Sequence, residues 1–239
     1  MAAVILQATG LSRAFGGLRA VEAVDLNLTA GEIHALIGPN GAGKTTLVSL
    51  LSGRLSPDAG RIIFAGEDIT RLPAHTRVAR GIAYTFQITS IYGGLSVFDN
   101  LALAVQRHRP RDLRQAVQAA ADRVGLGSYL QAEAGLLSYG HQRLLELGMG
   151  LALHPRLLIL DEPTQGLAAG EIGDFINLIR GLQGTTILLI EHNMEVVMAL
   201  AQRITVLNMG QVLAAGTPAE IRANAAVQAA YLGVEHVAD

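Results

Sequence analysis

Apolar residues are grouped along this chain in short runs, and the first runs have the pattern of strands. They are separated by glycine, asparagine and aspartate, which predicts an antiparallel sheet. These runs lie near Val4–Thr9, Ala23–Leu28 and Arg61–Phe64. Between the second and the third, the run Glu32–Ile37 has the pattern of a buried strand and leads directly into a glycine-rich loop. A helix is expected next, from about Gly43 to Leu51, with Gly53 as its C-terminal stop.

The middle of the chain has a different pattern. After a short strand that ends in the segment Tyr84–Gln87, the spacing from Ser96 to Leu153 is mostly helical. Ser96 suits the N-cap of the first of these helices, because its hydroxyl can accept a hydrogen bond from an amide of the first turn. Two strand-like runs then return on either side of a further helix. These segments are Arg156–Glu162, Gly170–Gly181 and Thr185–His192. A strand, a helix and a strand at this spacing predict a parallel sheet with right-handed crossovers.

The order of these elements predicts one α/β domain over residues 1–239, with an antiparallel β subdomain. A helical subdomain is expected to be inserted at residues 88–155. A hairpin pattern around Met209–Gly210 is followed by two short helices, which form a C-terminal helical tail at residues 217–239.

Composition narrows the class of protein. The chain is 50% hydrophobic and only 16% charged, as expected of a folded domain. A net charge of −2 provides no general attraction to nucleic acid or to acidic membranes, so no nucleic-acid partner is expected. Without cysteine there is no disulfide framework and no thiolate metal site. The N-terminal residues lack the pattern of a signal peptide, and no apolar run reaches the ~18 residues that span a bilayer. A soluble cytoplasmic chain is therefore expected, and its high apolar content still allows it to dock on a membrane partner.

The glycine-rich loop reads GPNGAGKTT and matches the pattern G-x-x-x-x-G-K-[ST]. Glycine lets the backbone wrap closely around a polyphosphate, and the helix that follows directs its positive N-terminus at the same anion. Of 18 lysine and arginine residues, Lys44 is the only lysine. Its compact charge suits the β- and γ-phosphates, whereas the planar fork of arginine would not occupy the same place. A chance glycine-rich turn is the alternative, and the strand before the loop and the helix after it argue against that. The predicted nucleotide-binding residues here are Gly38, Pro39, Asn40, Gly41, Ala42, Gly43, Lys44, Thr45 and Thr46.

Two carboxylates follow the apolar strand LLILDE. If this strand is a buried parallel one, Asp161 lies at its carboxyl end, where open α/β sheets bind ligands. Asp161 and the hydroxyl of Thr45 are predicted to hold Mg²⁺, and Glu162 to orient or deprotonate the attacking water. The alternative is that these acidic residues merely end a strand at the solvent. The glycine-rich loop upstream argues against this alternative.

The segment LLSYGHQR begins another helix, whose N-terminus attracts anions. Leu137, Ser138, Gly140 and Gln142 resemble the signature segment of ABC-type ATP-binding subunits. The order of motifs is also similar to that family over essentially the whole chain. These motifs are Phe15, the loop Gly38–Thr46, Gln87, the signature, Asp161–Glu162 and His192.

The resemblance implies roles for residues that carry little information alone. In that family the signature of one subunit closes over the ATP held by the other, so two chains enclose two nucleotides head to tail. Phe15 would stack on adenine, Gln87 would link the γ-phosphate and Mg²⁺ to the helical subdomain, and His192 would contact the γ-phosphate. A core phenylalanine, a surface glutamine and a histidine that only ends a strand are the alternatives. Lys44, Gln87, Glu162 and His192 are the implied catalytic residues, and Leu137, Ser138, Tyr139, Gly140 and His141 the implied contacts to the partner's ATP.

A narrower resemblance is to the ATP-binding subunits of branched-chain (hydrophobic) amino-acid importers. It rests on FGGLRAV, TFQ, LSYG and the ending GTPAEI…AAYLG. In such systems two ATPase subunits pair beneath two membrane permeases on the inner face of the plasma membrane, and a periplasmic binding protein supplies the substrate. Similar subunits serve urea, short amides and aromatic acids, so these substrates stay open. A soluble ABC module without a membrane partner, or a catalytically idle partner in a heterodimer, are the other hypotheses.

The chain departs from the family pattern at two positions. His141 stands where the signature usually has glutamine. Ala168 stands where ABC proteins commonly have aspartate, or asparagine in the importer branch, a residue that helps to join the two sites across the dimer. The second departure bears on communication between the sites more than on hydrolysis.

Overall fold

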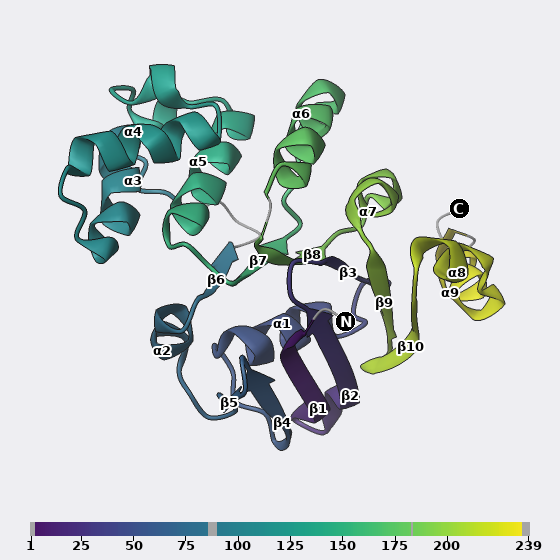
Figure 1. Cartoon of the computed structure of the whole chain (residues 1–239). Helices are drawn as coiled ribbons and strands as arrows, with labels where there is room; N and C mark the ends of the chain where they lie inside the picture. Colours follow the sequence, from purple (N-terminus) through teal and green to yellow (C-terminus); the bar gives the residue numbers. More distant parts are fainter. Residues whose placement is uncertain (1–2, 86–89, 183, 236–239) are drawn as a thin grey trace.

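The computed structural model of the chain describes residues 3–85, 90–182 and 184–235, and these residues form two sheets with helices around them (Figure 1). A four-stranded sheet has the order β2-β1-β4-β5, and a six-stranded sheet has the order β10-β9-β3-β8-β7-β6. The combination of an antiparallel sheet, a mostly parallel sheet and flanking helices confirms the predicted α/β class.

The four-stranded sheet is antiparallel, as predicted, but its first two strands are longer than their apolar runs. The strands are β1 Val4–Phe15, β2 Leu18–Thr29, β4 Ala59–Phe64 and β5 Glu67–Asp68. Gly16 and Gly17 join β1 to β2 with φ angles of 53° and 88°, a left-handed conformation that glycine adopts at little cost. The apolar runs marked only part of each strand, since Leu11 and Val21 lie beyond them and are buried in the same core.

Four strands that were predicted from the sequence lie in the six-stranded sheet. They are β3 Ile33–Ile37, β6 Ile82–Thr85, β7 Leu157–Asp161 and β8 Thr186–Ile190. The pairs β3–β8, β8–β7 and β7–β6 are all parallel. β9 Arg203–Asn208 runs parallel to β3, and β10 Gln211–Gly216 returns antiparallel to β9 through the expected hairpin. The loops after β3, β7 and β8 therefore leave from one edge of the sheet, which is where a ligand binds in this architecture.

Helices cover this sheet. α1 follows β3. In the described part of the chain, three further α-helices lie between β6 and β7. These four helices are α1 Lys44–Ser52, α3 Val97–Val105, α4 Leu113–Arg123 and α5 Tyr139–Ala152. Single 3₁₀ turns accompany them at Gln106–His108, Gly127–Tyr129 and Ala134–Leu136. The remaining helices are α2 Ala74–Ala79, α6 Ala169–Arg180, α7 Met194–Leu200, α8 Pro218–Ala223 and α9 Ala225–Glu235.

The ends of the helices are set by local capping residues. Two helices were not predicted by the sequence analysis. Ser96 caps α3 as predicted, since its side chain accepts a hydrogen bond from the amide of Asp99. Gly53 ends α1 in the left-handed conformation. The missed helices, α2 and α7, have only six and seven residues, too few for an apolar period to become visible. None of the helices in the described ranges has the length and hydropathy that crossing a bilayer requires.

Two of the three hydrophobic clusters among the described residues lie on opposite faces of the parallel sheet at β7. Along β7, Leu158 and Leu160 pack in the core beneath α3, α4, α5 and α6, whereas Leu157 and Ile159 pack in the core shared with α1 and the antiparallel sheet. Figure 1 shows these two groups of elements on opposite sides of the strands. Alternate side chains of one strand thus hold both layers to the sheet.

A buried arginine anchors α1 at its C-terminal end. Arg77 of α2 is 1% exposed, and its guanidinium donates hydrogen bonds to the carbonyl oxygens of Leu50 (2.7 Å) and Leu51 (2.8 Å). It also donates to the carbonyl oxygens of Thr70 (3.0 Å) and Leu72 (2.9 Å). Carbonyls at the end of a helix lack partners within the helix, so the arginine satisfies them. The opposite end of α1, which begins at the glycine-rich loop, is thereby held in place.

Candidate functional site

The glycine-rich loop between β3 and α1 is surrounded closely by backbone. A Cβ atom at Gly38 would overlap the carbonyl oxygen of Leu207 in β9, and one at Gly43 would overlap the carbonyl oxygen of Ala20 in β2. Gly43 also has a φ of 99°. Glycine at these two positions is therefore required by space as well as by conformation, and the loop amides can turn toward a bound anion.

Lys44 is the first residue of α1 and is buried at the centre of the loop. Its Nζ donates hydrogen bonds to the carbonyl oxygens of Gly38 (2.7 Å) and Pro39 (3.1 Å). Burial lowers the pKa of Lys44, while the negative charges of Glu162 and Asp161 act in the opposite direction. An ammonium has three N–H donors, so within the described residues one remains for a phosphate.

Asp161 and Glu162 follow one another at the end of β7 but have different surroundings. Asp161 is 4% exposed and accepts a hydrogen bond from the hydroxyl of Tyr84 (2.7 Å). Burial raises the pKa of Asp161, and the adjacent charge of Glu162 adds to this. Glu162 has a φ of 48°, and its amide donates to the carbonyl oxygen of Ile190 (2.9 Å). A left-handed conformation at a non-glycine residue costs free energy and is concentrated at functional sites.

His192 follows β8 and meets Glu162. Its Nε2 lies 2.7 Å from Oε1 of Glu162. The His192 side chain is 42% exposed and that of Glu162 is 14% exposed, so both remain open to a ligand. The residues predicted from two separate strands therefore form one pair.

Glu191 is a residue that the sequence analysis missed. It is 3% exposed, and one of its oxygens accepts hydrogen bonds from the amide (3.0 Å) and hydroxyl (2.6 Å) of Thr164. Its other oxygen accepts from the amides of His192 (3.1 Å) and Asn193 (3.3 Å). One buried carboxylate thus ties the loop after Glu162 to the loop that carries His192. The sequence signal for this residue was a glutamate directly after the apolar run ILLI, because a buried charge needs hydrogen-bond partners.

A pocket of about 600 Å³ brings together most of the glycine-rich loop, Glu162 and His192, whereas Asp161 is not among the described residues that line it. It is lined by Leu18, Arg19, Ala20, Asn40, Gly41, Ala42, Gly43, Lys44, Thr45, Thr46, Glu162, His192 and Met209. Phe15 ends β1 and pairs in register with Leu18, which does line the pocket. The Phe15 ring is 43% exposed, with the guanidinium carbon of Arg13 5.0 Å from its centre. The structure thus brings the glycine-rich loop, Glu162 and His192 to one cavity and leaves Phe15 beside it.

The signature segment lies elsewhere. Ser138 caps α5, with its side chain accepting from the amide of His141 (3.2 Å), and Tyr139 is 43% exposed. A Cβ at Gly140 would overlap the carboxylate of Glu171 in α6. The predicted signature residues, Leu137 to His141, are absent from the described lining of the pocket above. The N-terminus of α5 instead leaves several of these residues open to the solvent.

The unusual Ala168 precedes α6 as its N-cap residue and has no side-chain oxygen to cap the helix. Glu171 supplies the other half of a capping box, since its Oε2 accepts a hydrogen bond from the amide of Ala168 (2.9 Å). The same carboxylate packs against Gly140. The end of the loop after Glu162 is therefore held against the signature helix of the same chain.

Comparison with known proteins agrees with this geometry. The family model described as ABC transporter matches residues 21–165. The chain belongs to the ABC transporter family. A second family model, described as branched-chain amino acid ATP-binding cassette transporter, matches residues 211–237 of this ABC ATPase. The resemblance read from the sequence is confirmed.

Relatives of this ABC ATPase match over almost all of its length. The high-affinity branched-chain amino acid transport ATP-binding protein BraF of Pseudomonas aeruginosa is 39% identical over 98% of this chain and 99% of the relative. LivG of Escherichia coli, which has the same description, is 38% identical over the same shares. The lipopolysaccharide export system ATP-binding protein LptB of Escherichia coli is 36% identical over 95% of this chain and 97% of the relative.

Solved structures agree in fold. A nucleotide-free ATP-binding cassette from an ABC transporter has a TM-score of 0.86 and 26% identity, covering 96% of this chain and 99% of that one. An ATP-binding cassette in its ADP conformation has a TM-score of 0.86 and 27% identity, covering 97% and 99%. The predicted ABC-type fold and ATPase class are thereby confirmed.

The residues of this ABC ATPase also fit a magnesium ion. The donors predicted for it are the hydroxyl of Thr45 and the carboxylate of Asp161, and the third predicted residue, Gln87, lies outside the described residues. Among the described residues there is no group of three or more histidine, cysteine or acidic side chains that could hold a metal ion alone. Mg²⁺ in nucleotide sites is held by one or two side-chain oxygens and the phosphates, and a hydroxyl and a carboxylate are side-chain donors of this kind.

We expect Asp161→Asn to stabilise the nucleotide-free protein. The pKa of Asp161 is raised above its ordinary value of 3.8, so the folded protein binds this proton more tightly than the unfolded chain does. The stability that this group contributes is therefore present at pH below 3.8 and is lost as pH rises through the raised value. At pH 7 the buried charge lowers stability, and asparagine removes that charge.

The measurement is thermal unfolding at pH 7 and near pH 4. A gain of about 1 kcal/mol would raise Tm by about 2–4 °C for a chain of this size. The gain should shrink toward pH 4, and Asp174→Asn, at an exposed aspartate of α6, should leave Tm nearly unchanged. A lower Tm for Asp161→Asn at pH 7 would contradict the expectation.

Proposed function

We propose that this chain is the ATP-hydrolysing subunit of an importer for branched-chain or other hydrophobic amino acids. The ATPase part rests on one observation, the contact of 2.7 Å between Glu162 and His192 in the same pocket as the glycine-rich loop. The substrate class rests on BraF and LivG, which are 39% and 38% identical over nearly the whole chain. The same chemistry would serve urea, amide or aromatic-acid importers, and these stay as alternatives.

In this proposal the loop amides and Lys44 hold the phosphates of ATP at the N-terminus of α1. Thr45 and Asp161 would hold Mg²⁺, which would supply positive charge to the phosphates. Glu162 orients a water molecule and accepts its proton as the oxygen attacks the γ-phosphorus, and the bond to the ADP oxygen breaks. His192 holds Glu162 through its Nε2 and contacts the γ-phosphate. Catalysis is then mainly positioning and charge stabilisation.

A second ATPase subunit, a copy of this chain or a paralogue, completes each site. The argument is that Ser138 and Gly140 lie outside the described lining of this chain's own pocket, while the α5 N-terminus has exposed residues. A helix N-terminus favours a phosphate. Head-to-tail pairing would bring the signature of each chain to the ATP of the other, and closure on ATP would reopen after hydrolysis.

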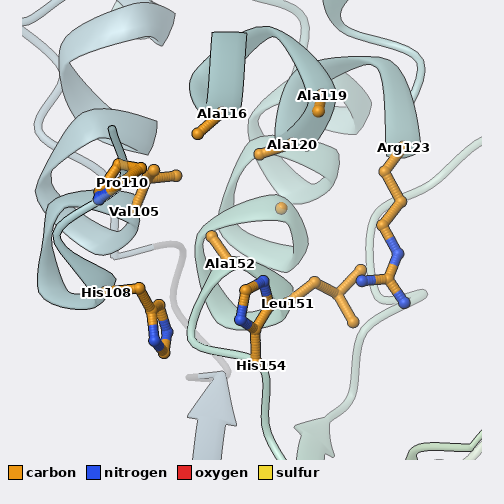
Figure 2. A pocket seen from close by; sticks show the side chains of 11 residues that line it. Val105, His108, Pro110, Ala116, Ala119, Ala120, Arg123, Leu151, Ala152 and His154 are labelled. Carbon is orange, nitrogen blue, oxygen red and sulfur yellow. The ribbon is translucent and has the colours of Figure 1, made fainter. Parts of the chain in front are cut away.

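The permease contact is proposed for a pocket in the helical region, which Figure 2 shows. It has a volume of about 330 Å³. Ala116 and Ala120 of α4 lie across from Ala152 and His154 at the end of α5. Small side chains leave room for a short helical segment of a membrane protein to approach closely. The rings of His154 and His108 stack at 4.4 Å.

The charge of this pocket indicates which segment it fits. Arg123, His108 and His154 contribute nitrogen groups, and no carboxylate is among the described residues that line the pocket. A cytoplasmic permease segment with an acidic residue beside small apolar ones would complement it. Two permeases, supplied by a periplasmic binding protein, would place the ATPase at the inner face of the plasma membrane.

The test is affinity purification of the chain from gently solubilised membranes of its own host, followed by mass spectrometry. Two different multi-span permeases and a second ATPase subunit support the importer, and transport assays with the matching binding protein then identify the substrate. Co-purification of lipopolysaccharide-export components, or of soluble partners and ribosomes alone, contradicts the importer while leaving the nucleotide chemistry intact.

A pair of variants tests the docking pocket in the same experiment. Ala120→Arg fills the pocket and adds a like charge, so the permeases should be lost while ATP binding by the isolated chain is kept. Gln115→Arg adds the same group at an exposed position of α4 outside this pocket and should retain them. Equal permease recovery with both variants would exclude this pocket as the contact.

A further inference from the structure

Tyr84 reaches Asp161 from the neighbouring strand. It lies in β6, where it pairs in parallel register with Ile159 of β7, two residues before Asp161. Residues two apart in a strand face the same side of a sheet. The Tyr84 hydroxyl therefore extends along that face and donates a hydrogen bond of 2.7 Å to Oδ2 of Asp161.

A cation keeps the Tyr84 ring in this position. Arg54 follows Gly53, the residue that ends α1, and its amide donates to the carbonyl oxygen of Ser49 (2.9 Å). Its guanidinium carbon lies 5.0 Å from the centre of the Tyr84 ring. The positive charge is also close enough to favour the ionised form of Asp161. Tyr84 is thus held between the end of the phosphate-binding helix and the carboxylate.

The phenol is a permanent donor in these surroundings. Burial, and next the hydrogen bond to Asp161, raise the pKa of Tyr84 above its ordinary value. The hydroxyl keeps its proton at physiological pH and engages one of the two carboxylate oxygens. The bond restrains rotation of the carboxylate and leaves its other oxygen for a further contact.

We propose that Tyr84 is a positioning residue for Mg²⁺ binding, acting through Asp161 with Arg54 as its support. The inference rests on the proposed role of Asp161 as a magnesium ligand. Outer partners that orient a ligand are worth about 10–100-fold in metal affinity. The sequence alone did not single out Tyr84, because a tyrosine in a half-buried strand is ordinary.

The experiment is Tyr84→Phe, which keeps the ring that Arg54 covers and removes only the hydroxyl. Binding of a fluorescent ATP analogue is measured in EDTA and in a Mg²⁺ titration, and Mn²⁺ bound to the protein–nucleotide complex is measured by electron paramagnetic resonance. Affinity in EDTA should be unchanged, and the half-saturating Mg²⁺ and Mn²⁺ concentrations should rise about tenfold. Tyr92→Phe, at a tyrosine that is 59% exposed, is the matched control and should show no shift.

Asp161→Asn separates failure of this inference from failure of the proposed function. If Asp161→Asn does not change the Mg²⁺ dependence, Asp161 is not a magnesium ligand and both proposals fall. If Asp161→Asn weakens Mg²⁺ binding but Tyr84→Phe stays within about twofold of the wild type, only the role of Tyr84 is overturned. In the Asp161→Asn background, Tyr84→Phe should add no further loss, because the hydroxyl acts through that carboxylate.

A second variant guards against a merely structural effect. Arg54→Met leaves the hydroxyl in place but removes its support, so a smaller shift of the same sign is expected in the Mg²⁺ titration. Each variant should still unfold in one cooperative thermal transition, with Tyr84→Phe a few degrees lower because the buried carboxylate loses a hydrogen-bond donor. A loss of affinity in EDTA equal to the loss in Mg²⁺ would mean general damage to the nucleotide pocket and would refute the proposal.

Discussion

Lys44→Ala is expected to weaken ATP binding by about 100-fold or more. A hydrogen bond from a charged donor contributes about 1.5–3 kcal/mol, and 2.8 kcal/mol corresponds to about 100-fold in Kd. The ammonium donates to the loop carbonyls of Gly38 and Pro39, and Gly38 and Gly43 are crowded by backbone from two strands. No other side chain is therefore expected to move in and replace the lost charge.

The variant Lys44→Arg tests why the only lysine of the chain stands at this position. The position is 7% exposed, and the space that holds an ammonium between the carbonyls of Gly38 and Pro39 is small. A planar guanidinium would displace the loop, so arginine should restore little of the affinity despite its charge. The comparison separates the effect of charge from that of shape.

Isothermal titration with ATP and Mg²⁺ measures both variants. Arg61→Ala, which removes an exposed cation of β4, is the charge-matched control and should bind like the wild type. A Kd for Lys44→Ala within about threefold of the wild type would contradict the assignment of the phosphate site. Affinity retained by Lys44→Arg would show that charge alone is sufficient at this position.

Glu162→Gln is expected to lower the rate of ATP hydrolysis by about 10²–10⁴-fold while ATP still binds, because a general base contributes a factor of this size. Glutamine keeps the shape of the side chain and can remain beside His192, but it cannot accept the proton of the attacking water. ATP should then persist in the site and hold two chains together. A phosphate-release assay measures the rate, and light scattering after size exclusion measures the mass with and without ATP.

The controls for this prediction separate chemistry from assembly. Glu195→Gln changes an exposed carboxylate in the first turn of α7 and should hydrolyse ATP normally. Hydrolysis by Glu162→Gln near the wild-type rate would remove Glu162 from its proposed role. If ATP leaves Glu162→Gln monomeric with every subunit pairing, the proposed two-chain arrangement is wrong while the pocket itself stands.

Much of the fold could be predicted from the sequence because the local sequence pattern favours the same elements that the structure contains. The apolar runs at β3, β7 and β8 are strands buried on both faces, which need continuous hydrophobic residues whatever surrounds them. Caps at Ser96 and Gly53 were equally readable, since each satisfies its own helix end. The helices α2 and α7 could not be predicted, because helices this short show no apolar periodicity and form through packing on the rest of the protein.

Prediction of the functional site was limited in the same way, because only features set by neighbouring residues could be predicted. The loop Gly38–Thr46 has a conformation and a ligand chemistry that follow from its own residues, so the sequence analysis could name it. Gln87 stays a prediction, because it lies outside the described residues. Glu191 and Tyr84 form hydrogen bonds with Thr164 and Asp161, which are distant from them in the sequence, so no sequence motif contains these contacts.

By itself the sequence determined the glycine-rich loop, the buried strands and the carboxylates that end one of them, because spacing and residue type control each of these locally. Only the tertiary structure decided that Glu162 meets His192, that the Glu171 carboxylate packs against Gly140, and that Tyr84 reaches Asp161. The physical reason is that parallel strands far apart in the chain end at one edge of a sheet. Their register, which depends on packing across both cores, sets which side chains come within hydrogen-bond distance.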